Sequence, residues 1–403
     1  MLRLLFLLLL GGAVWWLSGG RVGEAKHTDQ PEVAFQAAAT SADAAVASPP
    51  ATEEGSAAAA PTAARPSRTP LRVGAAEVAP DPEVARLIEA LAAQRWDDAQ
   101  GAWEALRLAT GEPRARLAEA LAQAAKGADL AGNLALLGAD NAFVHSELGR
   151  QVGQRIAAAA KRQPPEQAVV TLTRLIEGAM RGPIEKGDAA AKEFVDGVYS
   201  ALQRPLRRTV LNPAFLDGAE THEVLPGEAL SRIARSLRKR GVQVDAGTLM
   251  AFNRISDPRR LRAGQRLKVP LVPIRSVLEK RSYLLAVYAG DVIFRLYWVG
   301  HGRDDCTPET TFVVLSKQER PDWYADGRVI PYGHPENVLG DYFVKFEHAS
   351  YTGFGAHGTA EPKSVGTMAS AGCLRMLDAD IADYFRIVPH GSQVEIRASG
   401  SGY

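Results

Sequence analysis

The sequence is most informative at residues 357–376, which read HGTAEPKSVGTMASAGCLRM. His357 opens this segment beside a glycine, and Cys373 follows Gly372 near its end. A cysteine beside glycine with a histidine upstream is a candidate thiol–imidazole nucleophile site. A free thiol has a pKa of about 8.5, and an imidazole neighbour can lower it into the neutral range. Glycine also lets a substrate approach the backbone, whose amides can stabilise a developing oxyanion.

The surrounding residues follow a strand pattern. Three segments, 283–288, 292–299 and 311–315, are rich in the β-branched and aromatic residues that favour strands. Residues 289–291 (AGD) separate the first two and are typical of a turn. We therefore predict a mostly β domain over residues 274–398 that carries the candidate nucleophile.

This domain resembles the catalytic domain of the YkuD-type L,D-transpeptidases. The mark of that family is H-G, a variable gap and then S-x-G-C-x-R, which matches His357-Gly358 and residues 370–375 (SAGCLR). Further matching segments occur along about 120 residues: Thr307-Pro308, Thr311-Phe312, Trp323-Tyr324, Ile330-Pro331-Tyr332-Gly333, Pro335-Glu336-Asn337, Leu339-Gly340, Gly358-Thr359 and Glu361-Pro362.

The resemblance implies a two-step acyl transfer on peptidoglycan stem peptides and gives each matching residue a role. Cys373 would be the nucleophile, and His357 would be its base and later acid, oriented by a backbone carbonyl. Arg375 would support the nucleophile loop or a substrate carboxylate, Ser370 would hydrogen-bond within the site, and amides around Gly372 and Cys373 would form the oxyanion hole. Tyr332, Gly358 and Ala371 are expected to contact substrate. No cofactor and no metal are expected.

Two positions depart from the family pattern. Ala371 stands where many members carry a second histidine, and Thr310 replaces a glycine that is common there. An oxyanion contact made by the backbone amide survives the loss of the histidine side chain. We therefore expect activity, with an altered acceptor or rate.

Residues 220–271 predict a small βααβ unit that precedes the catalytic domain. It resembles a LysM domain at Val224, Pro226-Gly227, Leu230, Ile233-Ala234, Leu249, Asn253, Leu261, Gly264-Gln265 and residues 267–270. The resemblance implies binding to glycan strands that contain N-acetylglucosamine. Because Pro270 and Pro273 flank the junction, we expect an independent module.

The LysM-like unit has two unusual features and a strong local charge. Residues 227–230 read GEAL where the family has Gly-Asp-Thr-Leu, and the segment 236–245 is longer than usual. Both changes are expected near the sugar-binding edge. Eleven Lys or Arg against four Asp or Glu give residues 222–271 a net charge of +7. That charge indicates either attraction to an acidic wall polymer or a solvated face.

Residues 81–210 predict an all-α domain. Asp81-Pro82 is an N-cap and N1 pair, and apolar residues then recur at helical spacing from Val84 to Leu91. The spacing returns over residues 99–106, and we expect Trp96 and Trp103 to lie in the core. The domain serves either to dock an envelope protein or as a packed spacer, and the sequence leaves both open.

The first eighty residues indicate export and a tether. Arg3 precedes an uncharged apolar run over residues 4–17, which predicts a signal peptide or an N-terminal membrane anchor over residues 1–20. Residues 21–80 form a linker rich in Ala, Pro and Thr, which we expect to be disordered. We expect a periplasmic or cell-wall protein, with anchoring to the inner membrane left open.

Composition excludes several other classes. The 403 residues carry a net charge of +1, so no global positive field favours nucleic acid, and 46% hydrophobic residues exclude a wholly disordered chain. The histidines are scattered without zinc-site spacing, and no glycine-rich phosphate loop precedes a helix. The two cysteines cannot build a disulfide framework. Cys306 follows two aspartates that disfavour its thiolate, so we expect it to be a bystander.

Together these features predict a multidomain exported L,D-transpeptidase of cell-wall biogenesis and cell shape. Its helical domain, LysM module (βααβ) and mostly β catalytic domain would act on stem peptides and glycan strands, without nucleic acid. It would form cross-links or attach a protein to a stem. The alternatives are an L,D-carboxypeptidase that uses the same site and a non-catalytic peptidoglycan-binding scaffold.

Overall fold

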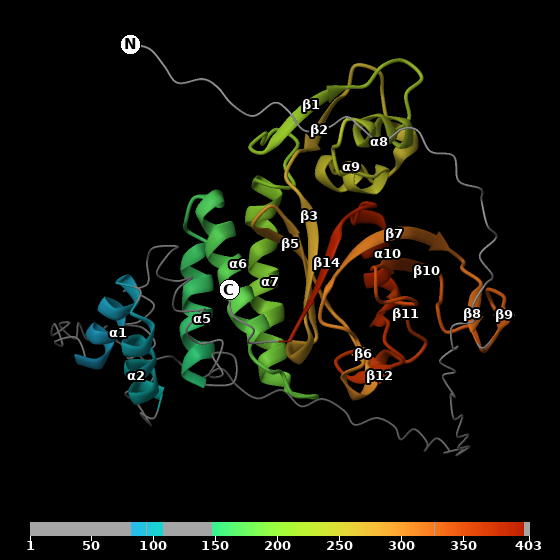
Figure 1. The fold of residues 1–403 in the computed structure, drawn as a ribbon. Coiled ribbons are helices and arrows are strands. Elements are labelled where there is room, and N and C mark those ends of the chain that lie inside the picture. The colour runs from blue at the N-terminus through green and yellow to red at the C-terminus, as the bar shows by residue number, and fades with distance from the viewer. Residues whose placement is uncertain (1–81, 94, 108–146, 326, 399–403) are drawn as a thin grey trace, which may run out of the picture. The chain divides into compact units, whose positions relative to one another are not determined.

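The computed structural model describes residues 82–93, 95–107, 147–325 and 327–398 (Figure 1). The predicted signal or anchor segment, the linker and residues 108–146 lie outside the described residues. None of the helices described is both long and apolar enough to cross a membrane.

The N-terminal part of the described chain is helical. Its helices are α1 (Pro82–Ala92), α2 (Trp96–Arg107), α5 (Glu147–Ala160), α6 (Pro165–Arg181) and α7 (Ala189–Arg208). Proline at N1 starts α6, and the Asp188 carboxylate caps α7 by accepting a hydrogen bond from the Ala191 N–H at 2.9 Å. Trp103 is fully buried, as predicted. The extent of the helical domain over 81–210 stays a prediction.

Helices α6 and α7 pack against the catalytic sheet. Thr173 of α6 accepts a hydrogen bond from the Ile293 N–H, and Glu177 accepts one from the Tyr288 hydroxyl, both at 3.3 Å. Asp196 of α7 accepts a hydrogen bond from the Trp298 indole at 2.9 Å. One face of each helix is therefore committed to the sheet and is not free to dock another protein.

The LysM-like unit has the predicted βααβ order: β1 (Ala219–Glu223), α8 (Leu230–Lys239), α9 (Ala246–Asn253) and β2 (Arg266–Pro270), with a short 3₁₀ turn at Pro258–Arg260. Strands β1 and β2 pair antiparallel. Its own small core consists of Val224, Leu230, Ile233, Ala234, Leu237, Val244, Leu249, Leu267 and Val269. Asn253 joins α9 to β2, because its side chain bonds both the N–H and the carbonyl of Lys268.

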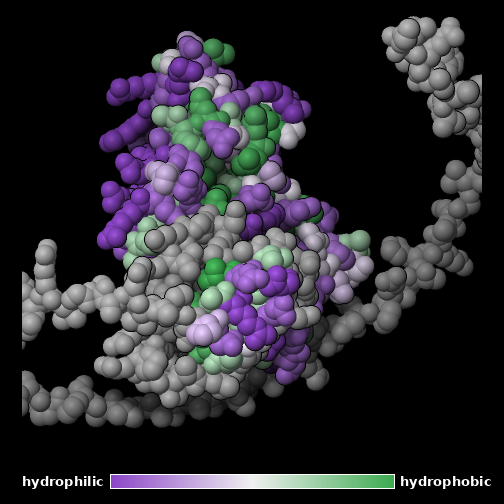
Figure 2. Space-filling model, turned by 90° about the vertical axis from the view of Figure 1, so that its left-hand side faces the viewer, coloured by the Kyte–Doolittle hydropathy of each residue, from purple (hydrophilic) through white to green (hydrophobic). Residues whose placement is uncertain are grey.

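The surface of this unit is polar. On the face shown in Figure 2, hydrophilic side chains dominate the upper part of the molecule, with smaller apolar patches between them. The glutamate of the GEAL segment has a local structural role: Glu228 accepts hydrogen bonds from the Leu225 N–H at 2.9 Å and from His222 at 3.0 Å, which closes the turn before α8.

The catalytic domain is mostly β, as predicted. Its elements are β3 (Ile274–Glu279), β4 (Leu284–Ala289), β5 (Val292–Trp298), β6 (His301–Gly302), β7 (Thr311–Glu319), β8 (Trp323–Ala325), β9 (Arg328–Ile330), β10 (Tyr342–Glu347), β11 (Gly355–Gly358), β12 (Met368–Ser370), β13 (Leu374–Met376), α10 (Asp378–Ile387) and β14 (Gln393–Arg397), with short 3₁₀ turns at Lys280–Ser282, Arg303–Asp305 and Pro362–Ser364.

Eight strands form one sheet in the order β13-β11-β10-β7-β14-β3-β4-β5. Two pairs, β6–β12 and β8–β9, lie outside it. Helix α10 packs against β10 and β11, the strands next to the candidate nucleophile. The site therefore lies near one end of the sheet, where β11 and β13 run parallel.

The LysM-like unit is docked on the catalytic domain, although the prolines at the junction predicted independence. Thr248 donates a hydrogen bond to the Ile387 carbonyl at 2.9 Å, and Gln243 donates one to the Gly391 carbonyl at 2.8 Å. Gly247 permits the close approach of α9 to α10, since a Cβ there would lie 2.0 Å from the Arg386 carbonyl oxygen. The long segment 236–245, expected near the sugar-binding edge, ends in this interface.

Candidate active site

Strand pairing brings the predicted histidine and the nucleophile segment together. In the parallel ladder of β11 and β13, His357 is the register partner of Arg375, and Cys373 immediately precedes β13. Side chains of register partners on paired strands share a face of the sheet. His357 and Arg375 are therefore placed toward the same face, and the Arg375 charge acts on both His357 and Cys373.

The His357 imidazole is buried and oriented by backbone. Its side chain is only 4% exposed, and Nδ1 lies 2.6 Å from the Gly358 carbonyl oxygen, to which we assign an Nδ1–H donor. This tautomer leaves the lone pair on Nε2, where a base needs it. Burial, with the charge of Arg375, lowers the pKa of His357 to about 4 against the opposing effect of the Gly358 carbonyl.

Cys373 is a neutral thiol in the resting site. The residue is half-buried, and its Sγ lies 3.4 Å from the Gly353 carbonyl oxygen. Removal of the sulfur from water raises the pKa of Cys373 to about 11, although the Gly355 backbone and Arg375 favour the thiolate. Both members of the pair are therefore uncharged near neutral pH.

Ser370 and Thr307 bind three backbone groups of the loop that carries the candidate nucleophile Cys373. The Ser370 hydroxyl donates to the Cys373 carbonyl at 2.7 Å and accepts from the Gly372 N–H at 3.0 Å. The Thr307 hydroxyl donates to the Gly372 carbonyl and accepts from the Gly302 N–H, both at 2.8 Å. The matching Thr307-Pro308 segment in the sequence does not by itself indicate that the Thr307 hydroxyl has this role.

One of the two backbone amides expected to form the oxyanion hole is already hydrogen-bonded within the loop. The Gly372 N–H is engaged by Ser370, so it is not free for a substrate oxygen in this state. Within the described residues the Cys373 N–H makes no hydrogen bond, which leaves it available. Gly372 instead allows a backbone conformation that residues with a side chain rarely adopt, because its φ is 133°. A Cβ at this position would lie 2.7 Å from the Phe354 ring.

Arg375 provides the positive charge of the site. Its guanidinium is mostly buried and lies 3.1 Å from the carboxylate of Glu361, which is exposed. Because the partner is solvent-accessible, the pair leaves the arginine charge free to act on Cys373 and His357.

The predicted substrate-contact residues lie in different settings. Tyr332 is 42% exposed and donates a hydrogen bond to the Asp341 carboxylate at 2.6 Å. Ala371 is exposed beside the nucleophile, whereas Gly358 is buried and acts on His357 through its carbonyl. At the second departure from the family pattern, Thr310 lies 3.0 Å from His348 Nε2, so the threonine has a structural partner.

Cys306 is a free, exposed cysteine. It packs against Gly302, where an added Cβ would lie 2.5 Å from the Cys306 sulfur. In the described part of the chain no three His, Cys, Asp or Glu side chains gather closely enough to hold a metal ion.

Comparison with known proteins identifies both domains. The family model YkuD, the L,D-transpeptidase catalytic domain, matches residues 274–396, and the LysM domain model matches residues 222–270. YqjB of Bacillus subtilis, named as an L,D-transpeptidase, is 36% identical over 123 residues, which cover 30% of this chain and 69% of that protein. The chain belongs to the L,D-transpeptidase family. A second relative, YkuD of Bacillus licheniformis, also named as an L,D-transpeptidase, is 28% identical over 43% of this chain and 97% of its own length.

The chain also resembles solved structures in part of its fold. An L,D-transpeptidase from Mycobacterium smegmatis matches 34% of this chain and 64% of that chain, at 21% identity and a TM-score of 0.27. This chain thus spans a little under two thirds of that structure. The LysM match supports peptidoglycan binding, and the two domains together suggest an extracytoplasmic protein.

Proposed function

We propose that this protein is an exported peptidoglycan L,D-transpeptidase with Cys373 as its nucleophile. One observation carries the proposal: His357, held by the Gly358 carbonyl at 2.6 Å, is the register partner of Arg375, two residues after Cys373. The arrangement supplies a base with a fixed tautomer, a thiol and a nearby positive charge.

In the first step Cys373 Sγ attacks the carbonyl of the L-centred third residue of a tetrapeptide stem. His357 Nε2 takes the thiol proton as the carbon–sulfur bond forms, and the Cys373 N–H stabilises the oxyanion. The tetrahedral intermediate then expels the terminal D-alanine, whose amine takes the proton from His357. The product is a thioester on Cys373.

In the second step an amine acceptor attacks the thioester carbonyl. His357 takes a proton from the amine and returns one to the departing thiolate, which restores the neutral pair. Arg375 and Ser370 are positioning residues: Arg375 lowers the energy of the thiolate, and Ser370 fixes the loop. Tyr332 and Ala371 lie on accessible surface where a stem could contact them.

The acceptor decides between three outcomes. A second stem gives a cross-link, an envelope protein gives attachment, and water gives an L,D-carboxypeptidase. Ala371, which stands where many family members carry a second histidine, is exposed beside Cys373. An acceptor that approaches Cys373 therefore meets no histidine side chain at position 371.

The decisive experiment is intact-mass analysis after incubation with a tetrapeptide stem or a carbapenem. We expect an adduct on the full chain, release of D-alanine from the stem and no adduct on Cys373→Ala. A protein that binds insoluble peptidoglycan but never acquires an adduct would instead be a non-catalytic scaffold. Supplying a stem, an envelope protein or only water as acceptor then identifies the product.

A further inference from the structure

A groove of about 440 Å³ lies between the LysM-like unit and the catalytic domain. One wall is formed by α8 and α9, and the other by α10 with the ends of β7 and β10. None of the residues proposed for catalysis lines it.

The groove is on the opposite side of the sheet from the His357 side chain. Phe343 is the register partner of His357, so both side chains point to one face, and Tyr342 next to it points to the other. Tyr342 lines the groove, as does its register partner Glu319. A molecule in the groove is therefore separate from the stem that reacts at Cys373.

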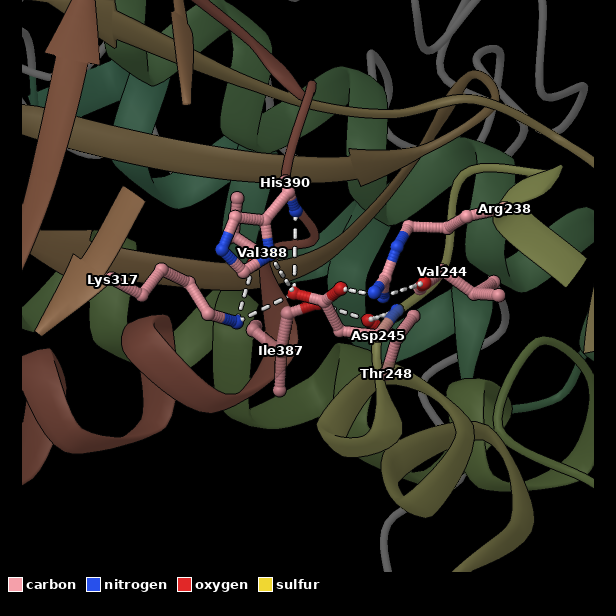
Figure 3. A network of polar contacts seen from close by, with 8 residues as sticks. All are labelled: Arg238, Val244, Asp245, Thr248, Lys317, Ile387, Val388 and His390. Atoms are coloured by element: carbon pink, nitrogen blue, oxygen red, sulfur yellow. Dashed lines mark hydrogen bonds and ion pairs between the residues drawn. The ribbon is translucent and has the colours of Figure 1, made fainter. Parts of the chain in front are cut away.

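A charge network lies in the wall of the groove, because Arg238, Asp245 and Lys317 line it. Figure 3 shows the Asp245 carboxylate at the centre of Arg238, Lys317 and His390. Lys317 Nζ lies 2.9 Å and His390 Nδ1 lies 2.8 Å from Asp245 Oδ2, while Arg238 bonds the other oxygen. Both oxygens of the Asp245 carboxylate are thus bonded to these three side chains. Asp245 therefore does not neutralise the charge of any further side chain in the groove.

The groove keeps an uncompensated positive charge. Four cationic side chains, Arg235, Arg238, Lys317 and Arg386, line it against the two carboxylates of Asp245 and Glu319, a difference of +2. The side chains of Arg235 and Arg386 make no hydrogen bond or ion pair with any residue that the structure describes, and both are exposed. They stand on opposite walls, one from each domain.

Between these arginines the groove has an apolar surface. The Tyr342 and Phe385 rings lie 4.9 Å apart, and Met250 lines the groove with them. Two exposed guanidinium groups across an apolar surface suit a ligand with separated carboxylates and small apolar groups between them. This composition favours an acidic peptide over a phosphate polymer, which has no methyl groups for the rings.

We propose that this groove binds a second, non-reacting acidic peptide stem of the wall polymer, with carboxylates on Arg235 and Arg386. The identity of the ligand as a stem rests on the proposed function. Binding there would tether the polymer to the enzyme and raise the local concentration of stems at Cys373.

The test is titration calorimetry on the full chain carrying Cys373→Ala, with a synthetic tetrapeptide stem as probe. The matched probe is the same peptide with its carboxylates amidated. The groove variant is Arg235→Gln with Arg386→Gln, and the control is Arg240→Gln with Arg259→Gln, which removes equal charge from sites paired with Glu220 and Asp257. We expect the groove variant to lose roughly tenfold or more in affinity for the acidic peptide, since hydrogen bonds to charged groups are strong.

Equal binding of both probes, or equal losses in groove and control variants, would overturn the proposal. A groove that prefers inorganic polyphosphate to the acidic peptide would also overturn it, in favour of a phosphate polymer. Carbapenem acylation of Cys373, measured separately on proteins that retain the cysteine, reports on the proposed reaction. Groove-dependent binding without acylation would thus refute the reaction alone, and acylation without groove-dependent binding would refute the groove alone.

Discussion

At the scale of single residues, burial keeps Cys373 and His357 neutral before substrate arrives. The pKa of the thiol is raised to about 11 and that of the imidazole is lowered to about 4, both chiefly by loss of water. The proton must then move during the attack on the substrate, because a stable thiolate–imidazolium pair would need the two pKa values in the opposite order.

The raised pKa of the Cys373 thiol predicts how the rate of its alkylation depends on pH. In the Cys306→Ala protein, the rate of Cys373 modification by iodoacetamide should rise by about tenfold per pH unit from pH 7 toward pH 10, because only the thiolate reacts. Mass spectrometry of quenched samples gives the rate. A plateau below pH 8 would show that the ion pair forms in the free protein.

Removal of the Cys373 thiol should abolish formation of the acyl adduct, whereas removal of the Cys306 thiol should not. We expect Cys306→Ala to retain most acylation by a carbapenem or stem, since its thiol lies on the surface. Cys373→Ala should lose the adduct entirely, on the order of 10⁴ or more in rate, without unfolding. An adduct on Cys373→Ala, or none on Cys306→Ala, contradicts the assignment.

The sequence motif predicts that Cys373 and His357 react together, but it does not predict the hydrogen bonds around them. The Ser370 hydroxyl could bond any of several nearby groups, and its use of the Gly372 N–H depends on how the loop folds back. Thr307 is 65 residues from Gly372, so no local pattern could reveal that its hydroxyl holds the loop.

The variant Thr307→Val tests whether the Thr307 hydroxyl positions the loop that carries Cys373. The valine keeps the volume but leaves the Gly302 N–H and the Gly372 carbonyl without their partner in a buried place. We expect acylation to slow by roughly 10- to 100-fold, which corresponds to a loss of about 1–3 kcal/mol. Thr307→Ser, which keeps the hydroxyl, should restore the rate. Equal rates for all three proteins would remove Thr307 from the site.

At the scale of elements, the turn between β12 and β13 requires glycine at position 372. Gly366 in the preceding loop also has a positive φ, of 77°, but an added Cβ there meets nothing within 4 Å. Gly366→Ala therefore measures the strain of a left-handed φ without a clash, whereas Gly372→Ala combines a φ of 133°, which other residues rarely adopt, with the clash against Phe354.

We expect Gly366→Ala to cost about 1 kcal/mol in the free energy of unfolding and to leave acylation nearly unchanged. Gly372→Ala should cost more and slow acylation by roughly 100-fold or more, because a displaced Cys373 loses its geometry. Urea unfolding and adduct formation measure the two effects. Matching values for both variants would show that the Phe354 contact is unimportant.

Strand positions were predictable where β-branched and aromatic residues gather. The expected segments 283–288, 292–299 and 311–315 correspond to β4, β5 and β7, with ends that differ by a few residues. The packing of α6 on β5 was not predictable, because it depends on hydrogen bonds such as Thr173 to Ile293 across 120 residues.

At the scale of the molecule, the sequence predicts two modules, and the structure joins them through the buried carboxylate of Asp245. The hydrogen bonds of Thr248 and Gln243 that dock the LysM-like unit join residues 139 and 148 apart, so they leave no pattern in either segment alone. Phe252 of α9 also packs edge-to-face on Phe294 of β5 at 5.5 Å, within the larger core. A LysM unit held this firmly keeps any glycan that it binds at a fixed distance from Cys373.

Asp245→Ala tests whether this docking matters. Asp245 is 6% exposed, and its removal leaves the buried Lys317 without a counter-charge, which should cost about 3–5 kcal/mol in the free energy of unfolding. Burial alone would raise the pKa of Asp245, but Lys317 and His390 outweigh it and hold the pKa below its usual value. The stabilisation is therefore present above about pH 4 and is lost as the pH falls through the lower folded-state value.

We expect calorimetry at pH 7 to show a lower melting temperature for Asp245→Ala, and proteolysis to cut near residues 271–273. Turnover of insoluble peptidoglycan should fall while carbapenem acylation, which needs only the catalytic domain, stays near the original rate. Asp257→Ala is the control, because that carboxylate bonds only the exposed Arg259 on the same unit. If Asp245→Ala matches this control in melting temperature and in wall turnover, the buried carboxylate does not fix the LysM-like unit, and the two domains act as the independent modules that the junction prolines predicted.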